Sequence, residues 1–124
     1  MNDRTTFDLC HPQRRVWFSE LLHPGTGIGN LAGFAHFPGR EEELPKLGEA
    51  INQIIEAHDA LRIHLTPGSP TPKQYFAEFE PHELEVLRLD DHGSVLREAA
   101  KKPFELMHSP LYHFDLVQLP NERI

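Results

Sequence analysis

The sequence predicts an α/β fold, an α+β sandwich in which helices pack on one side of a mixed sheet. Two observations support this prediction. A long amphipathic helix stands near the middle of the chain, and short apolar or alternating segments of strand length stand on both sides of it. Helical and strand-like segments alternate along 124 residues, which is room for one domain with one core.

The first half of the chain contains two predicted helices with a predicted strand between them. Pro12 suits a helix start and the Pro-Gly pair at 24–25 suits a helix end, which predicts a helix over 12–22. The segment 30–37, NLAGFAHF, is rich in aromatic and small residues and predicts a strand. Leucines and isoleucines at spacings of three, four and seven predict the amphipathic helix over 41–61.

The second half contains three short predicted strands, a helix and a final strand. The short strands are predicted over 62–65, 74–79 and 84–89, and a Pro-Gly turn makes the first two a hairpin-like pair. The helix is predicted over 90–102, and alternation predicts the last strand over Leu111–Leu119.

Charge and cysteine content exclude several classes of protein. Nineteen acidic residues against twelve basic ones give a net charge of −7, which argues against a broad phosphate-binding surface and against nucleic acid as a partner. No apolar run approaches the roughly 20 residues that cross a bilayer, and no signal peptide is recognised. The lone Cys10 excludes an internal disulfide framework and a cysteine-rich metal site, so a cytoplasmic protein is expected.

Nine histidines invite a metal or acid–base interpretation, but their spacing supports neither. None forms a His-x-x-x-His or His-Glu-x-x-His pattern, so scattered histidines are expected and a zinc site is not. Cys10 precedes the first helix, where a thiolate is stabilised, yet no base is identified near it. No nucleophile elbow, Walker loop or dinucleotide fingerprint is present, and the glycine-rich segment 25–29 is expected to be a flexible loop lining a cleft. Spacing alone gives no catalytic set.

The start of the chain resembles the first core motif of the condensation domains of nonribosomal peptide synthetases. That motif follows a Ser/Thr-x-Ala-Gln-x-Arg-x-Trp pattern, and residues 11–18 read HPQRRVWF. Three motif residues are kept, namely Gln13, Arg15 and Trp17. Cys10 and Pro12 replace the usual hydroxyl residue and alanine.

Two later segments resemble further motifs of the same family. Residues 57–65, AHDALRIHL, are similar to Arg-His-Glu-x-Leu-Arg-Thr-x-Phe and keep His58, Leu61 and Arg62. Residues 102–111, KPFELMHSPL, are similar to Pro-Phe-Asp-Leu followed by Gly-Pro-Leu. All three matches occur in the family's order.

The resemblance implies a fold and a reaction. Residues 1–124 are expected to form the N-terminal lobe fragment of a chloramphenicol-acetyltransferase-like condensation domain, ending before the His-His-x-x-x-Asp-Gly motif. The parent domain is expected to form an amide bond between an acyl thioester and a carrier-bound aminoacyl thioester. Segments 23–30, HPGTGIGN, and 73–75, KQY, resemble the starter subtype of lipopeptide synthetases, which uses a fatty acyl donor in antibiotic biosynthesis. The fragment itself is expected to be catalytically inactive.

The resemblance also implies roles for five residues. Gln13, Arg14 and Trp17 are expected on the tunnel side of the first helix, and Arg62 and His58 are expected to support the active site. The resemblance implies that Arg62 forms an ion pair with a residue beyond this chain. From its sequence position alone, at a helix-to-strand junction, Arg62 could equally form a buried ion pair or be solvated. No catalytic residue, metal ligand or bound cofactor is expected. Substrates are expected on phosphopantetheine arms or coenzyme A, with carrier protein domains and the rest of the synthetase as partners.

Two alternatives stay open beside this interpretation. One is a standalone, non-catalytic binding or scaffolding module, and the other is a fragment of another CoA-dependent acyltransferase of the same fold. The resemblance also implies that the last predicted strand would pair with the strand that carries the family's histidines, so its edge is expected to be open in this chain. Because unpaired strands recruit another chain, a homodimer through Leu111–Leu119 is expected.

Overall fold

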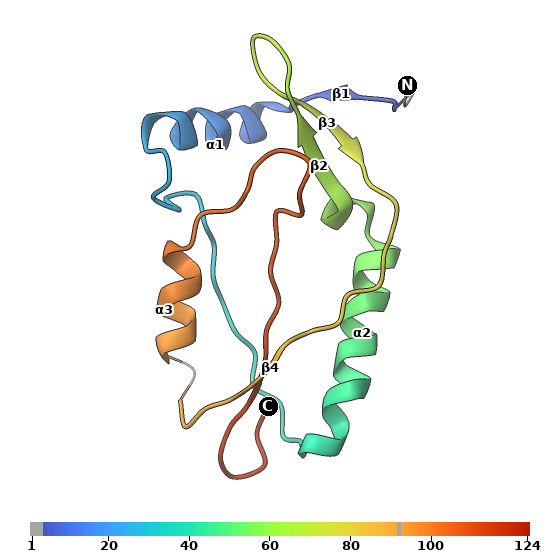
Figure 1. Ribbon diagram of the computed structural model, residues 1–124, viewed down its shortest axis with the longest axis vertical. Helices are drawn as coiled ribbons and strands as arrows, with labels where there is room; N and C mark the ends of the chain where they lie inside the picture. Colours follow the sequence, from blue (N-terminus) through green and yellow to red (C-terminus); the bar gives the residue numbers. More distant parts are fainter. Residues whose placement is uncertain (1–3, 92) are drawn as a thin grey trace.

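Helices and two small sheets make up the fold, which a computed structural model describes over residues 4–91 and 93–124 (Figure 1). The elements in chain order, with η for a 3-10 turn, are β1 (Phe7–Asp8), α1 (His11–Leu22), η1 (Glu41–Glu43), α2 (Leu44–Ala57), η2 (Asp59–Arg62), β2 (Ile63–Thr66), β3 (Lys73–Phe76), β4 (Val86–Arg88), α3 (Gly93–Lys101) and β5 (Leu116–Gln118). This mixture of helices and strands confirms the predicted α/β class.

The strands form two separate sheets where one mixed sheet was predicted. The first sheet is antiparallel in the order β1-β3-β2, and the second is the parallel pair β4 and β5. The predicted hairpin is confirmed, because β2 and β3 pair in a register that sets His64 opposite Tyr75. Parallel strands need a crossover connection, and α3 lies in the one that joins β4 to β5.

The amphipathic stripe of the middle helix buries its apolar face as predicted, although the helix is shorter than 41–61. Within α2, Leu44 and Ile55 are almost completely buried. The backbone of His58 is extended, with φ −117° and ψ 100°, so α2 ends there and the chain continues as η2. The helical hydrogen bonds are thereby interrupted before Leu61, the last residue of the stripe.

Two predicted strands need correction. Residues 30–37 are extended but enter neither sheet. A β-strand needs a hydrogen-bonded neighbour, and in this segment only Phe37, at its end, exchanges backbone hydrogen bonds with a distant residue, Ile124. Of Leu111–Leu119, only Leu116–Gln118 pairs with β4, because β4 itself is only three residues long. Sequence alternation indicates extended backbone in both segments, yet pairing depends on distant residues.

The hydrophobic core is small for a chain of this length. Its centre is a cluster of Leu44, Leu116 and Ile124, with partly buried neighbours from α2 and Leu84. Many large apolar side chains stay exposed, including Leu22 at 76% and Leu31 at 100%. Extensive exposed apolar surface is typical of an interaction surface or a ligand-binding groove.

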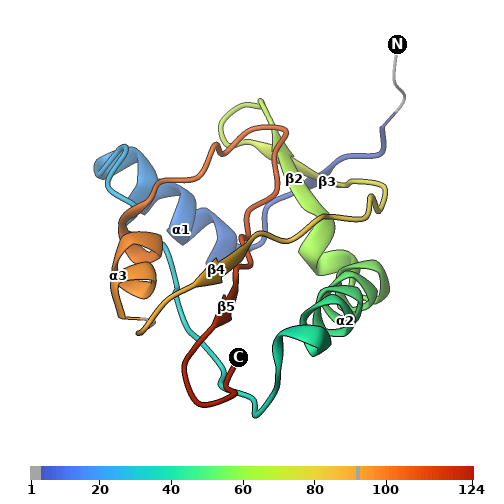
Figure 2. The same cartoon turned by 60° about the horizontal axis from the view of Figure 1, so that its bottom comes forward.

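Helices lie on two sides of the extended central segments. In Figures 1 and 2, α1 and α3 lie together on one side, α2 lies on the other, and β4 lies between them. Residues 30–37 run through the middle of this arrangement. The space between the two groups of helices is where the candidate site lies.

Candidate functional site

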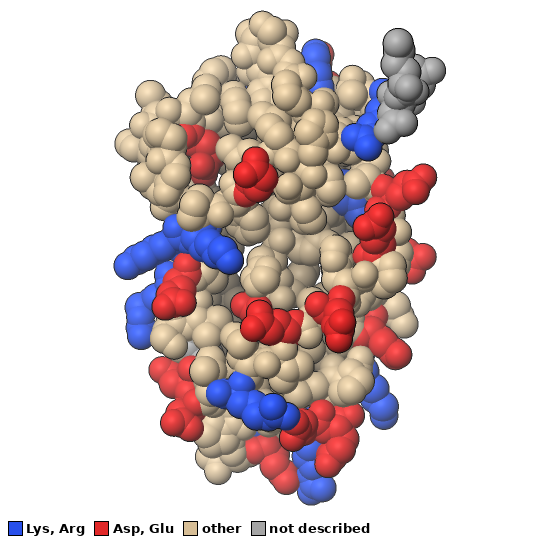
Figure 3. Space-filling model, in the orientation of Figure 1, with Lys and Arg blue, Asp and Glu red and all other residues tan. Residues whose placement is uncertain are grey.

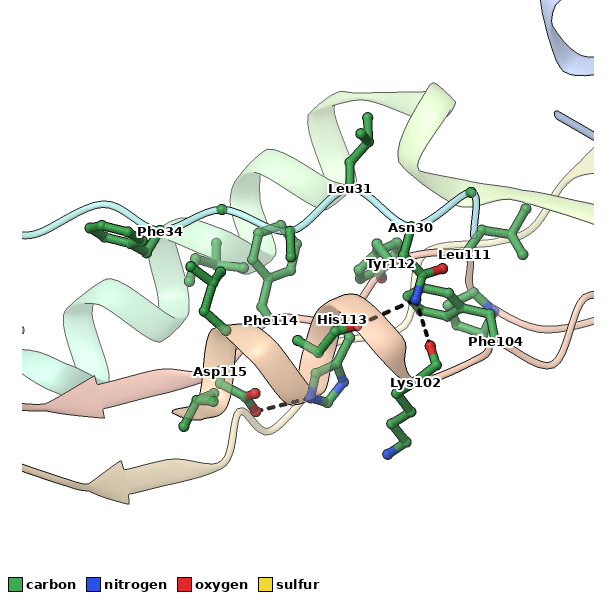
Figure 4. A pocket seen from close by; sticks show the side chains of 18 of the residues that line it. Asn30, Leu31, Phe34, Lys102, Phe104, Leu111, Tyr112, His113, Phe114 and Asp115 are labelled. Carbon is green, nitrogen blue, oxygen red and sulfur yellow. Dashed lines mark hydrogen bonds and ion pairs between the residues drawn. The ribbon is translucent and has the colours of Figure 1, made fainter. Parts of the chain in front are cut away.

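A large apolar cavity lies among α1, α2, α3 and two extended segments. Its volume is about 1310 Å³, above the roughly 300–1,000 Å³ of ordinary small-molecule sites. Residues 29–37 and 102–106 and residues 110–117 supply much of its wall, and Figure 4 shows part of it. In the space-filling view a hollow opens near the centre of the molecule, with charged side chains around it (Figure 3). This space suits a long apolar ligand or a further segment of protein.

The first helix presents two of its three expected tunnel-side residues to this cavity. Gln13 and Trp17 line the wall, while Arg14 is exposed and is not among the lining residues. Gln13 and Gln74 form a reciprocal pair of amide hydrogen bonds, at 2.6 and 3.0 Å. The Gln13 Oε1 also accepts the backbone N–H of Cys10, the N-cap of α1, at 2.8 Å. Gln13 therefore fixes the start of α1 against β3.

Arg62 binds backbone carbonyl groups, which is neither of the two arrangements left open from its sequence position. Its Nη1 donates to the carbonyl oxygens of Ile55 at 2.8 Å and Glu56 at 2.6 Å, and its Nε donates to that of Ala77 at 3.2 Å. The last carbonyls of a helix lack intrahelical partners and carry partial negative charge, so a guanidinium satisfies them well. Arg62 thus ties the end of α2 to the chain that leaves β3.

His58 ends α2 in a similar way. Its backbone N–H donates to the carbonyl of Ile54 at 3.0 Å, and its Nδ1 lies 2.9 Å from the same oxygen. The imidazole is exposed and lines neither of the two large cavities. In this structure His58 stabilises the turn that carries Arg62.

A second, more polar cavity of about 940 Å³ contains two Tyr–His pairs. Tyr75 Oη and His108 Nδ1 share a hydrogen bond of 2.9 Å, and Tyr112 Oη and His82 Nε2 share one of 2.8 Å. His108 has a positive φ of 55°, which is uncommon for a residue other than glycine and persists only where several contacts hold it. These phenol and imidazole groups can donate, accept or hold protons inside one cavity.

The imidazole of His64 faces the same cavity. Its ring makes an edge contact with Tyr75, at 5.7 Å between centroids. The pKa of His64 lies below its ordinary value, chiefly because burial disfavours the charged form and further because Arg4 and His108 add positive charge nearby. Burial likewise raises the pKa of the Tyr112 hydroxyl.

The loop after α1 is fastened to the end of α3. Asn30 Nδ2 donates to the carbonyl oxygens of Lys102 at 2.6 Å and Ala99 at 3.3 Å, and the former contact appears in Figure 4. A Cβ on Gly27, whose φ is +66°, would lie 2.9 Å from the carbonyl oxygen of Lys101. The glycine-rich segment expected to line a cleft does reach the apolar cavity, through Gly29.

Sequence reasoning did not single out the Tyr–His pairs or Asn30. The hairpin pattern could have set His64 near Tyr75, because paired strands fix their cross-strand neighbours. Nothing local relates His108 to Tyr75, since 33 residues separate them. Within the described residues, no group of three or more His, Cys, Asp or Glu side chains is placed to hold a metal ion. No helix in the described part is long and apolar enough to span a membrane.

Comparison with known proteins identifies the family. The family model "Condensation domain" matches residues 3–124. One of the plipastatin synthase subunits of Bacillus subtilis (strain 168) is 34% identical over 125 residues, a region that covers 96% of this chain and 5% of that protein. Surfactin synthase subunit 1 of the same strain is 26% identical over 97% of this chain and 4% of its own length.

Solved structures show the same fold. A mutant of the starter condensation domain of rhizomide synthetase RzmA, in complex with C8-CoA, superimposes with a TM-score of 0.81 at 23% identity. The alignment covers 96% of this chain and 29% of that one. The first condensation domain of the calcium-dependent antibiotic synthetase gives a TM-score of 0.82 at 16% identity, covering 98% and 33%. The chain thus spans about a third of these domains and a few per cent of the curated synthetases, and it belongs to the condensation-domain family.

Proposed function

We propose that the chain forms one wall of the substrate tunnel in a condensation domain of a nonribosomal peptide synthetase. The complete domain makes an amide bond between an acyl thioester and an aminoacyl thioester on a carrier protein. The observation that carries this proposal is the apolar cavity lined by Gln13 and Trp17, two residues of the family's first motif, in a chain that matches the family from residue 3 to 124.

A fatty acyl donor is the best-supported substrate class. Apolar side chains such as Leu31, Phe34 and Phe114 line the cavity, which suits an alkyl chain. The relatives support the same class, because a starter condensation domain of this fold was solved with C8-CoA. We infer a starter-type domain that joins the acyl group to the first amino acid, with its donor on coenzyme A or a phosphopantetheine arm.

The chain's own residues act by positioning in this proposal. Gln13 and Trp17 shape the tunnel wall, and Arg62 and His58 hold the turn after α2 that supports the active site. An ion pair between Arg62 and an acidic residue outside the chain remains part of the proposal, since guanidinium carries five N–H donors and the carbonyl contacts use only part of them. Arg14 is exposed and has no role in the wall.

Partners and place of action follow from the same reaction. We infer that carrier protein domains and the remainder of a synthetase are the partners, in the cytoplasm. By itself the chain is inactive, because the family's His-His-x-x-x-Asp-Gly motif does not occur in its sequence. Within Leu111–Leu119, residues Leu116–Gln118 pair with β4 and Leu119 pairs with Arg123. We infer that two copies of the chain pair through the rest of this edge.

A chimeric domain tests the proposal. Residues 3–124 replace the matching segment of the rhizomide starter condensation domain, whose structure with C8-CoA and Leu-SNAC is known. The expected result is an N-octanoyl-leucyl product from these two substrates. Trp17→Ala is expected to lower the initial rate by about tenfold, because it removes a half-buried aromatic side chain from the cavity wall. Phe18→Ala is the matched control, because Phe18 is exposed and lies outside the cavity wall.

A further inference from the structure

Three nitrogen-containing side chains surround one buried tyrosine in the second, more polar cavity. Tyr75 is 5% exposed, and the guanidinium of Arg4 lies over its ring, 4.4 Å from the centroid. The imidazole of His64 contacts the same ring edge-on, and Tyr75 Oη shares its hydrogen bond of 2.9 Å with His108 Nδ1. All four side chains line the cavity. We call Arg4, His64, Tyr75 and His108 together the Tyr75 cluster.

Backbone pairing holds the Tyr75 cluster together. His64 and Tyr75 are opposite each other in the register of β2 and β3. His108 donates its backbone N–H to the carbonyl of Leu65 in β2, at 2.8 Å. In Figure 1, β2 and β3 lie at the end of the molecule where the N-terminus is marked. The cluster therefore joins segments that are far apart in sequence, and tertiary structure fixes its arrangement.

The Tyr75 cluster has hydrogen-bond donors that no other part of the described chain uses. Among the residues that the structure describes, the imidazole of His64 has no hydrogen-bonding partner and the guanidinium of Arg4 has no ion pair. A protonated His108 has no acceptor atom, so its Nδ1–H donates to Tyr75 Oη and leaves the phenolic hydrogen available. Guanidinium, imidazole and phenol can therefore all donate to a bound ligand.

The electrostatic field at the Tyr75 cluster favours an anion. Burial first, and then the positive charges of Arg4 and His108, lower the pKa of His64, so both charges that act on this imidazole are positive. Arg62 elsewhere in the cavity already binds backbone carbonyls, and His82 is paired with a tyrosine. The other titratable lining groups, on the loop after β3 and on segment 110–112, are Glu78, Glu80, His82 and Tyr112. An acidic chain thus concentrates positive charge at one point, which attracts anions.

We propose that the Tyr75 cluster binds one phosphate group, with Arg4, His64 and Tyr75 donating hydrogen bonds to its oxygens. These donors are not coplanar, because the guanidinium lies over the face of the tyrosine ring, Oη lies in its plane, and the His64 ring is tilted by 64° against it. A tetrahedral anion accepts from several directions, whereas a carboxylate accepts mainly in its own plane. A single local site is compatible with a net charge of −7, which argues only against a broad phosphate-binding surface. The proposal is independent of the reaction proposed above.

Phosphate titration of the full 124-residue chain tests the proposal. The readout is the imidazole proton resonances of His64 and His108 in NMR spectra, recorded with inorganic phosphate at constant ionic strength. We expect both resonances to shift and saturate with a Kd of about 1 mM. Arg4→Met removes a charged donor and is expected to weaken binding by about tenfold. Arg14→Met is the matched control, because Arg14 is exposed and lies outside this cavity, and its Kd should stay within about twofold of the parent value.

The pH dependence of anion binding tests the part of His64. An anion beside this imidazole favours its charged form, so binding takes up a proton and tightens as the pH falls. Sulfate is the probe here, because it is tetrahedral and its charge stays constant between pH 7.5 and 5.5. We expect the sulfate Kd of the parent chain to fall by about tenfold over this range, and that of His64→Gln to fall by about threefold or less.

Each of three results would overturn the proposal. Imidazole shifts that grow linearly with phosphate and never saturate would show that the cluster holds no site. An unchanged Kd in Arg4→Met, which alters an exposed side chain next to the N-terminus, would show that the guanidinium does not bind the anion. Acetate binding as tightly as phosphate would show a carboxylate site, whereas we expect acetate to bind about tenfold more weakly.

Discussion

The guanidinium Nη1 of Arg62 lies 2.8 Å from the carbonyl oxygen of Ile55, whose side chain is 1% exposed and among the most buried in the molecule. The charged side chain of Arg62 thus donates to the last carbonyl groups of α2, beside the most buried residue of that helix. Substituting Arg62 with Met keeps much of the apolar stem and removes the donors to three carbonyls. We expect the free energy of unfolding to fall by about 2 kcal/mol, since hydrogen bonds to charged groups are worth roughly 1.5–3 kcal/mol.

Urea denaturation followed by circular dichroism checks this prediction. Arg14→Met is the matched control, because Arg14 is exposed on α1, and surface substitutions change stability by roughly 0.5 kcal/mol or less. Equal losses in the two variants would mean that the carbonyl contacts of Arg62 contribute nothing to stability.

The Gln13–Gln74 amide pair should behave as a coupled unit. Gln13→Ala and Gln74→Ala each remove both reciprocal hydrogen bonds, so the double variant should lose less stability than the sum of the single ones. We expect a coupling free energy of about 1 kcal/mol from a double-mutant cycle in urea. Gln53→Ala on the exposed face of α2 serves as the control for loss of a glutamine side chain. Strict additivity would show that the pair does not fasten α1 to β3.

The two left-handed glycines before Asn30 should differ in their tolerance of alanine. Both have positive φ, +66° at Gly27 and +70° at Gly25, so alanine costs about 1 kcal/mol of backbone strain at each. A Cβ at Gly27 also meets the carbonyl oxygen of Lys101, whereas nothing lies within 4 Å of one at Gly25. Gly27→Ala is therefore expected to lower the thermal midpoint more than Gly25→Ala. Calorimetry of the two variants checks this order, and the reverse order would refute the contact between the loop and α3.

His64 should make stability depend on pH on the acidic side of neutrality. Its folded-state pKa is lowered, so between that pKa and the ordinary value of 6.5 the unfolded chain binds more protons than the folded one. Stability from the neutral imidazole is complete above pH 6.5 and is lost as the pH falls through the folded pKa. Urea midpoints measured from pH 7.5 to 5 should therefore decline less in His64→Gln than in the parent chain. His23→Gln is the control for loss of an imidazole side chain, because His23 is exposed and lies outside this cavity. Identical slopes for the parent chain and His64→Gln would contradict the assignment.

Local patterns predicted those elements whose backbone hydrogen bonds are themselves local. The helical hydrogen bonds of α2 and the hairpin of β2 and β3 join residues close in sequence, and both elements were predicted near their observed positions. Segment 30–37 was predicted as a strand because its composition favours extended backbone. Its pairing with Ile124 involves a residue almost ninety positions away, which no window along the chain contains.

The candidate site was likewise predicted only in part from the sequence. The motif resemblance selected Gln13, Trp17 and Arg62, and the structure sets the first two in the cavity wall. The carbonyl partners of Arg62 were not foreseen, because a sequence does not show which helix end a side chain reaches. The Tyr75–His108 pair was missed since His108 lies in an irregular segment with positive φ, where neither helical nor strand periodicity applies.

Product formation by the chimeric starter domain tests the central claim most directly. A folded chimera that contains residues 3–124 should convert C8-CoA and Leu-SNAC into N-octanoyl-leucyl product, detected by mass spectrometry, with Trp17→Ala much slower and Phe18→Ala nearly unchanged. The isolated chain should form no product above buffer. A chimera with native circular dichroism that forms no product, or an isolated chain that forms it, would contradict the account.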